Sequence, residues 1–131
     1  MNPKKYLKEN KRLKNFFKKL NVDLYVVTIA SNKYSQRLQG ALGVRELIKK
    51  TYALGEEYPI VKSKFEIYEK IRKKNNLKRK EVLIAGDNYL LDLKQANDKG
   101  YPAVLVHGRE NLKIKKLIKV KNIYQLKRAI V

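Results

Sequence analysis

Apolar positions follow two patterns along the chain, helical spacing and short uninterrupted runs. The first pattern predicts an amphipathic helix that begins at Asn2-Pro3, a capping residue followed by proline. Its apolar face consists of Tyr6, Leu13, Phe16, Phe17 and Leu20. The run Val22–Ala30 (VDLYVVTIA) is rich in β-branched residues and predicts a strand covered on both faces. The chain therefore begins with a helix followed by a buried strand.

The same alternation continues to the C-terminus. A helix is predicted from Ser31-Asn32 to Gly43, then a helical piece over 44–50 and a small strand over 51–54. Ser63 and Glu66 form a capping box, which predicts a helix with Phe65, Tyr68 and Ile71 inward. Further elements are a strand over 81–85, a helix closing at Gly100, a strand over 102–106 and helical pieces from Asn111.

Strands that alternate with helices are typical of a parallel sheet. The predicted fold is therefore a three-layer, Rossmann-like α/β sheet with helices on both faces. Strands 22–30, 81–85 and 102–106 are expected in one sheet, in a single domain spanning 1–131.

Charge is the strongest feature of the composition. Thirty-two lysines and arginines stand against twelve acidic residues, a formal net charge of +20. Such a field attracts anions, so the basic surface is either a nucleic-acid or acidic-partner interface or non-specific surface charge. No apolar run approaches the ~20 residues that span a bilayer, and the first residues lack a signal-peptide pattern. With no cysteine either, a cytoplasmic protein is expected.

Polar side chains follow the predicted strands at the edge where parallel sheets bind ligands. Ser31 and Asn32 follow strand 22–30, and Asp87 follows strand 81–85, with Asp92 five residues further on. Lys62 precedes the helix that returns to strand 81–85. Each also has an ordinary structural explanation: Ser31, Asn32 or Asp87 as a helix cap, and Lys62 or Asp92 as exposed surface. His107, the single histidine, is expected to be a loop residue.

The order and spacing of these residues resemble the haloacid dehalogenase-like (HAD) hydrolases, especially small phosphatases of the phosphoglycolate phosphatase and pyrimidine 5′-nucleotidase type. The family's strand ending in Ser/Thr-Asn corresponds to VVTIASN, and its Gly-Asp motif with a later Asp corresponds to IAGDNYLLD. Its lysine, about 25 residues before the acidic motif, corresponds to Lys62. The likeness covers about residues 5–130.

The resemblance implies a role for each residue. Ser31, with Asn32, would bind a phosphoryl group, and Lys62 would offset its charge. Asp87 would ligate Mg²⁺, with Asp92 ligating or orienting it. The substrate would be a phosphorylated small molecule or nucleotide, and the short interval between Ser31 and Lys62 leaves no room for a large cap domain.

One family element is absent from the sequence. The family's nucleophile is the first aspartate of an Asp-x-Asp motif on an earlier strand, and the chain's four aspartates contain no such pair. Relative to the family, the domain is truncated at its N-terminus, and any Mg²⁺ is expected to bind weakly or not at all. Either strands 22–30 and 81–85 pair directly, the arrangement we expect, or another chain inserts a strand.

Three hypotheses follow. The chain is a HAD-like phosphatase domain that is incomplete alone and needs a complementing chain or a homo-oligomer. Alternatively, it is a non-catalytic basic module that binds nucleic acid or an acidic partner. As a third alternative, it is an unrelated small α/β domain such as a nucleotide binder.

Overall fold

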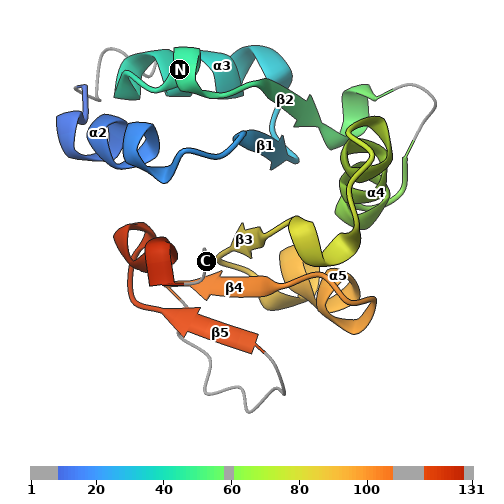
Figure 1. Cartoon of the computed structure of the whole chain (residues 1–131). Coiled ribbons are helices and arrows are strands. Elements are labelled where there is room, and N and C mark those ends of the chain that lie inside the picture. Colours follow the sequence, from blue (N-terminus) through green and yellow to red (C-terminus); the bar gives the residue numbers. More distant parts are fainter. Residues whose placement is uncertain (1–8, 58–60, 108–116, 129–131) are drawn as a thin grey trace. The chain divides into compact units, whose positions relative to one another are not determined.

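A computed structural model of the chain describes residues 9–57, 61–107 and 117–128 (Figure 1). The chain divides into two compact units, Met1–Ser63 and Lys64–Val131, and each is described by itself below. Both units consist of parallel strands flanked by helices. Within the described residues, no helix is both long and apolar enough to cross a membrane.

The first unit contains two helices and two strands. They are α2 (Lys11–Leu20), β1 (Tyr25–Thr28), α3 (Asn32–Leu42) and β2 (Lys50–Ala53), with 3₁₀ turns at Arg45–Leu47 and Leu54–Glu56. The sequence fixes the helix ends through local hydrogen bonds. Asn10 caps α2 by accepting from the Leu13 amide, and Gly43, at a φ of +80°, lets the chain turn after α3.

β1 and β2 form a parallel two-stranded sheet, with Val26 opposite Thr51 and Val27 opposite Tyr52. α3 packs against β2 (Figure 1). The buried residues of β2 are Thr51, Tyr52 and Ala53. By contrast, all four residues of β1 are only half-buried.

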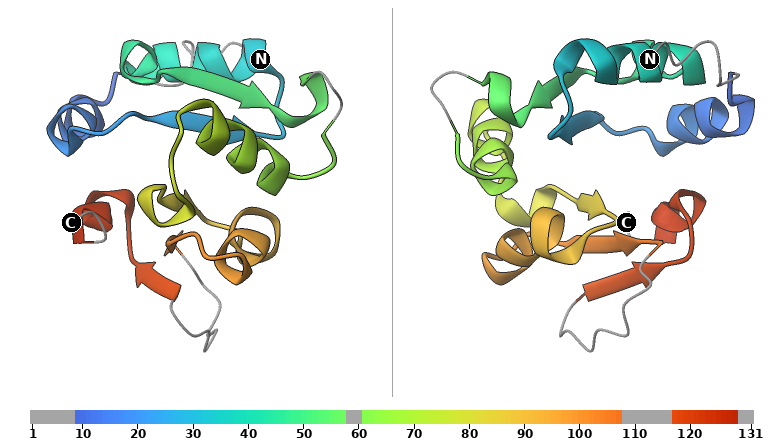
Figure 2. Two further views of the ribbon diagram at one scale, coloured as in Figure 1. Left: turned by 45° about the vertical axis from the view of Figure 1, so that its right-hand side comes forward. Right: turned by 180° about the vertical axis from the view of Figure 1, so that it is seen from behind.

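The second unit is built on a three-stranded parallel sheet. Its elements are α4 (Lys64–Lys74), β3 (Ile84–Gly86), a π-helical turn (Tyr89–Leu93), α5 (Lys94–Asp98), β4 (Ala103–Val106) and β5 (Leu117–Val120), with 3₁₀ turns at Arg79–Glu81 and Ile123–Arg128. β4 lies between β3 and β5 and is buried along its whole length (Figure 2). This central position is what its uninterrupted Ala-Val-Leu-Val run predicts.

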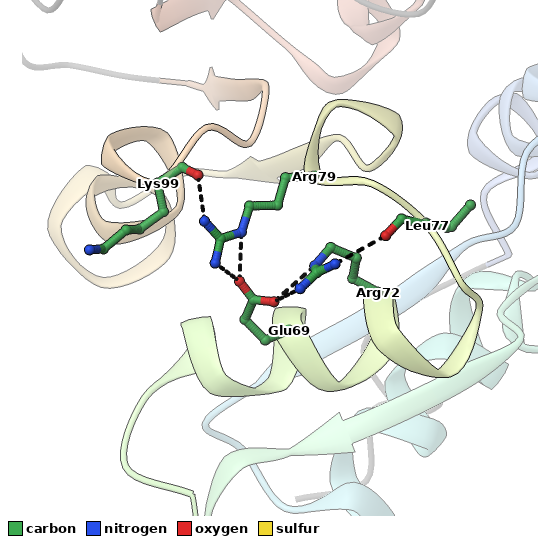
Figure 3. Close-up of polar contacts among 5 residues, drawn as sticks. All are labelled: Glu69, Arg72, Leu77, Arg79 and Lys99. Carbon is green, nitrogen blue, oxygen red and sulfur yellow. Dashed lines mark hydrogen bonds and ion pairs between the residues drawn. The ribbon is translucent and has the colours of Figure 1, made fainter.

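A network of charges fastens α4 to the segments on either side of the sheet (Figure 3). Glu69 accepts from Arg72 Nε at 2.8 Å and from Arg79 Nε at 2.7 Å, and Arg79 also donates to the carbonyl of Lys99. The Arg79 guanidinium lies over the ring of Tyr101, 5.9 Å from its centroid. Burial alone would raise the pKa of Glu69, but the two arginines outweigh it and lower that pKa.

The predicted fold class is confirmed: the fold is α/β with parallel sheets and flanking helices, and the described residues contain no cap domain. The helices predicted to end at Gly43 and Gly100 do so, with Gly100 at a φ of +97°. The predicted start of the first helix at Asn2-Pro3 lies outside the described residues.

Three expectations were wrong. β1 is not in one sheet with β3 and β4, and among the described residues it pairs only with β2, so β1 and β3 do not pair directly. The strand expected over 81–85 is Ile84–Gly86, because Glu81 ends a 3₁₀ turn. The C-terminal segment is not wholly helical: Leu117–Val120 forms a strand, since pairing with β4 outweighs its local propensity.

Candidate functional site

The carboxylate of Asp92 is held inside the second unit by a lysine. Lys64 Nζ lies 2.7 Å from Asp92 Oδ1, and the two side chains are only 16% and 10% exposed. Lys64 is the first residue of α4, and Asp92 lies in the π-helical turn that follows β3. The helix N-terminus also favours a nearby negative charge. Asp92 is therefore a partly buried, paired carboxylate rather than an exposed helix residue.

Two further groups fix the position of Asp92. The amide of Asn88 donates to Oδ2 at 3.2 Å, and the hydroxyl of Tyr68 donates to the Asp92 carbonyl at 2.9 Å. Burial, together with the nearby Asp92 charge, raises the pKa of Tyr68 well above its usual value, so Tyr68 remains a donor. Both carboxylate oxygens of Asp92 are thus engaged.

Gly86, the last residue of β3, leaves room for this carboxylate. A Cβ added at Gly86 would lie 2.5 Å from Asp92 Oδ2 and 2.6 Å from Asp92 Cβ. Such distances are shorter than any real contact between these atoms. The glycine of the Gly-Asp motif is therefore required by the close approach of Asp92 to the backbone.

Asp87 differs from Asp92 in its surroundings. It is exposed, directly after β3, and the cap of the following turn is Asn88, whose side chain accepts from the Leu91 amide. The three other aspartates pair with lysines: Asp23 with Lys49, Asp92 with Lys64 and Asp98 with Lys94. Within the described parts of the chain, Asp87 is the aspartate that no lysine neutralises.

Sequence reasoning missed Lys64, and helical periodicity could have found it. Lys64 lies on the same face of α4 as the buried Ile67, Tyr68 and Ile71, at positions i, i+3, i+4 and i+7. A lysine on a buried helical face needs an anionic partner, and Asp92 is that partner. Lys62 lies two residues before α4 and is exposed, and its role at the phosphoryl group stays a prediction.

In the first unit, the predicted phosphate-binding residues form the N-terminus of α3. Ser31 is the helix cap: its hydroxyl accepts from the Tyr34 amide at 3.1 Å. The amide of Asn32 donates to both oxygens of Glu56, at 3.3 and 3.2 Å. A carboxylate therefore occupies the position that an anionic ligand would take at this helix end. The convergence of Ser31, Lys62 and Asp87 at one edge stays a prediction.

The described residues do not complete a magnesium site. No group of three or more histidine, aspartate or glutamate side chains is close enough to hold a metal ion within residues 9–57, 61–107 and 117–128. Because Lys64 and Asn88 engage both oxygens of Asp92, only Asp87 has a carboxylate available in the second unit. His107 is an exposed residue directly after β4, with a φ of +58°, as expected for a loop residue.

Sequence comparison finds no relative: no family model matches the chain, and no curated protein matches it. Structure comparison does find similar folds. One is a HAD phosphatase from Thermococcus onnurineus, with a TM-score of 0.72 at 15% identity, covering 91% of this chain and 55% of that protein. A HAD-superfamily hydrolase of subfamily IA from Geobacter sulfurreducens PCA has a TM-score of 0.72 at 14% identity, covering 93% and 56%.

A third similar structure is the core domain of a candidate phosphoglycolate phosphatase from Streptococcus pneumoniae TIGR4. It has a TM-score of 0.68 at 13% identity, covering 91% of this chain and 82% of that domain. The fold is that of the HAD-like phosphatases. The chain spans only a little over half the length of the Thermococcus and Geobacter proteins. The resemblance drawn from the Ser-Asn and Gly-Asp motifs is thereby confirmed for the HAD-like fold.

Proposed function

We propose that this chain is the part of a HAD-like phosphomonoester hydrolase that carries the Gly-Asp motif, and that it is inactive alone. The observation that carries the proposal is the paired Asp92 beneath Gly86, next to the unpaired Asp87 at the carboxyl end of β3. One carboxylate is held for structure, and the other is exposed for a ligand. Polar groups at this end of a parallel strand are where α/β folds bind substrates.

The roles of the residues follow from their surroundings. Asp87 would ligate Mg²⁺, which supplies charge neutralisation at a phosphoryl group in this fold family. Asp92 would hold Lys64 in place and orient the turn that carries Asp87. Lys62 remains the proposed charge partner of the phosphoryl group, with Ser31 and Asn32 as its hydrogen-bond donors once Glu56 is displaced.

Incompleteness follows from the sequence. An aspartyl nucleophile needs a second carboxylate as general acid/base, and the four aspartates contain no Asp-x-Asp pair. Mg²⁺ also prefers six oxygen ligands, and Asp87 offers one carboxylate. The remaining ligands and the nucleophile would have to come from a segment outside these 131 residues.

Phosphatase assays test the proposal directly. With Mg²⁺, the purified chain is expected to hydrolyse p-nitrophenyl phosphate or nucleoside monophosphates at background rates. A peptide or protein with an Asp-x-Asp strand should raise the rate, and Asp87→Asn should abolish that rise, whereas the control Asp98→Asn should not. Robust Mg²⁺-dependent turnover by the chain alone would refute its incompleteness.

The net charge of +20 favours a second candidate function, a non-catalytic module that binds nucleic acid or an acidic partner. Exposed lysines such as Lys18, Lys33 and Lys73 extend over α2, α3 and α4. Binding through such a surface should be sensitive to salt and indifferent to base sequence. It requires no contribution from Asp87, so the Asp87→Asn variant separates the two candidates.

A further inference from the structure

The outer strands of the two sheets differ in how they are protected. β2 and β5 each carry a lysine, Lys50 and Lys119, whereas β1 (Tyr-Val-Val-Thr) and β3 (Ile-Ala-Gly) carry no charged residue. Proteins commonly use lysine to keep an exposed strand edge from pairing with another chain. Among the described residues, β1 pairs only with β2 and β3 only with β4. β1 and β3 therefore present open edges without this protection.

Backbone hydrogen bonds show which residues face these edges. The Lys49 amide donates to the Leu24 carbonyl, which directs residue 24 toward β2. Because alternate residues of a parallel strand bond to opposite sides, Val27 directs its backbone groups away from β2. In the second unit, the Ile84 amide donates to the Pro102 carbonyl, so Ala85 directs its groups away from β4. Each open edge thus has an outward-facing donor and acceptor.

Exposure along these strands does not match their composition. Apolar, β-branched strands of parallel sheets are normally buried, as β4 is, yet β1 is half-buried throughout and Ala85 is exposed. Four of the five exposed large apolar residues in the described chain flank these two strands. They are Val22 (46% exposed) and Ile29 (72%) around β1, and Leu90 (71%) and Leu91 (63%) after β3. Such clustering marks a surface that another chain covers.

Charge selects the kind of occupant. A second copy would bring a further +20, so like charges would oppose self-association, whereas an acidic segment would be attracted. The parts of this sequence outside the described ranges contain no uninterrupted apolar run of four residues. We infer that β1 and β3 are docking edges for an extended, apolar and acidic segment of a partner polypeptide. The inference rests on the proposed function for one point, that its carboxylates complete the hydrolase.

A fluorescent peptide of about ten residues, the length of one strand, tests this inference. It has a β-branched apolar run followed by Asp-x-Asp, and its binding to the whole chain is measured by anisotropy at ~0.15 M salt, where exposed charges are screened beyond about 8 Å. The matched control peptide has the same composition in scrambled order. Saturable binding of the ordered peptide, at least about tenfold tighter than the scrambled one, is expected. Equal affinities would mean attraction by charge alone and would overturn the inference.

Edge variants locate the binding. Val27→Pro and Ala85→Pro each remove an outward-facing amide, and at least one should weaken binding about tenfold, whereas Val27→Thr and Ala85→Ser keep the amide and should not. Because proline could unfold a unit, the same hydrogen bonds are also removed from the peptide by N-methylating alternate residues. If neither methylated series nor either proline variant weakens binding, the inference is wrong. Dimerisation of the free chain that the proline variants abolish would assign the edges to a second copy instead.

Binding and catalysis separate the two proposals. A peptide that binds at these edges without producing phosphatase activity supports the docking edges and contradicts the proposed hydrolase. Mg²⁺-dependent hydrolysis by the chain, with no difference between the ordered and scrambled peptides, does the reverse.

Discussion

Lys64 and Asp92 are 28 positions apart in the sequence, and their side chains form the most buried lysine–carboxylate pair among the described residues, 2.7 Å from Nζ to Oδ1. Removing one partner of such a pair leaves the other charge without compensation in a low-dielectric environment. Lys64→Met should therefore lower the free energy of unfolding by about 2–4 kcal/mol, measured by chemical denaturation.

The matched control is Lys94→Met, which breaks a pair of the same chemistry with Asp98. Both of its side chains are more than half exposed, at 55% and 54%, so the loss should stay below about 0.5 kcal/mol. Equal effects of the two substitutions would show that burial does not distinguish these pairs. The double variant Lys64→Met/Asp92→Asn should recover part of the loss, because it leaves no unpaired charge.

Gly86→Ala should disturb the same pair from the side of the backbone. The added methyl group would overlap the Asp92 carboxylate, so either the ion pair or the end of β3 must move. Overpacking of this kind costs about 1–3 kcal/mol. Thermal unfolding gives the stability, and two-dimensional NMR should show shifts at Asn88 and Asp92.

Gly40→Ala provides the control for that substitution. Gly40 lies inside α3, and a Cβ there would meet nothing within 4 Å. Alanine is the better helix former, so this variant should gain up to about 1 kcal/mol. A loss at Gly40 similar to that at Gly86 would contradict the steric account.

Glu69 should make the second unit sensitive to acid. Its pKa is lower in the folded chain than the ordinary value of 4.5, because hydrogen bonds from Arg72 and Arg79 outweigh burial. A lowered folded-state pKa contributes stability above pH 4.5 that is lost as the pH falls through the folded-state pKa. Glu69→Gln should cost about 1–3 kcal/mol at neutral pH and flatten the pH dependence of stability below about pH 4.5.

Glu81→Gln serves as the comparison. Glu81 is exposed and accepts from the Lys78 amide, a hydrogen bond that the glutamine oxygen can also accept. This variant should keep both the neutral-pH stability and the acid dependence of the original chain. If the acid dependence survives in Glu69→Gln, other carboxylates cause it.

Elements with strong periodicity were predictable from the sequence. The helix after Ser63, the buried Ala-Val-Leu-Val strand and the glycine-terminated helices all appear as expected, because local propensity and burial agree there. The strand at Leu117–Val120 was missed because its Ile-Lys-Val pattern becomes a strand only through pairing with β4. Sheet partners of β1 and β3 were also mispredicted, since strand composition shows burial but not which strand provides it.

The candidate site was predictable in its motif and not in its pairing. Gly86, Asp87 and Asp92 stand out by order and spacing alone, whereas the partner of Asp92 depends on where α4 packs. The sequence favoured Lys62 by spacing, although the lysine that contacts Asp92 is Lys64. The distinction between the two aspartates, one paired and one exposed, arises only after the π-helical turn brings Asp92 back toward Gly86.

The basic surface leads to the last prediction, salt-sensitive binding of polyanions. A net charge of +20 should bind single- and double-stranded oligonucleotides at low salt, through counterion release and without base preference. Log–log plots of the binding constant against salt concentration give the number of phosphates neutralised, with a slope of about −0.9 for each on duplex DNA. Replacing two exposed lysines of one helix, as in Lys18→Gln/Lys19→Gln on α2, should make that slope less steep if α2 contacts the phosphates. The same exchange at Asp87→Asn should leave the slope unchanged. A base preference, or affinity that survives high salt, would instead indicate a specific nucleic-acid site, and no binding at low salt would remove the nucleic-acid candidate.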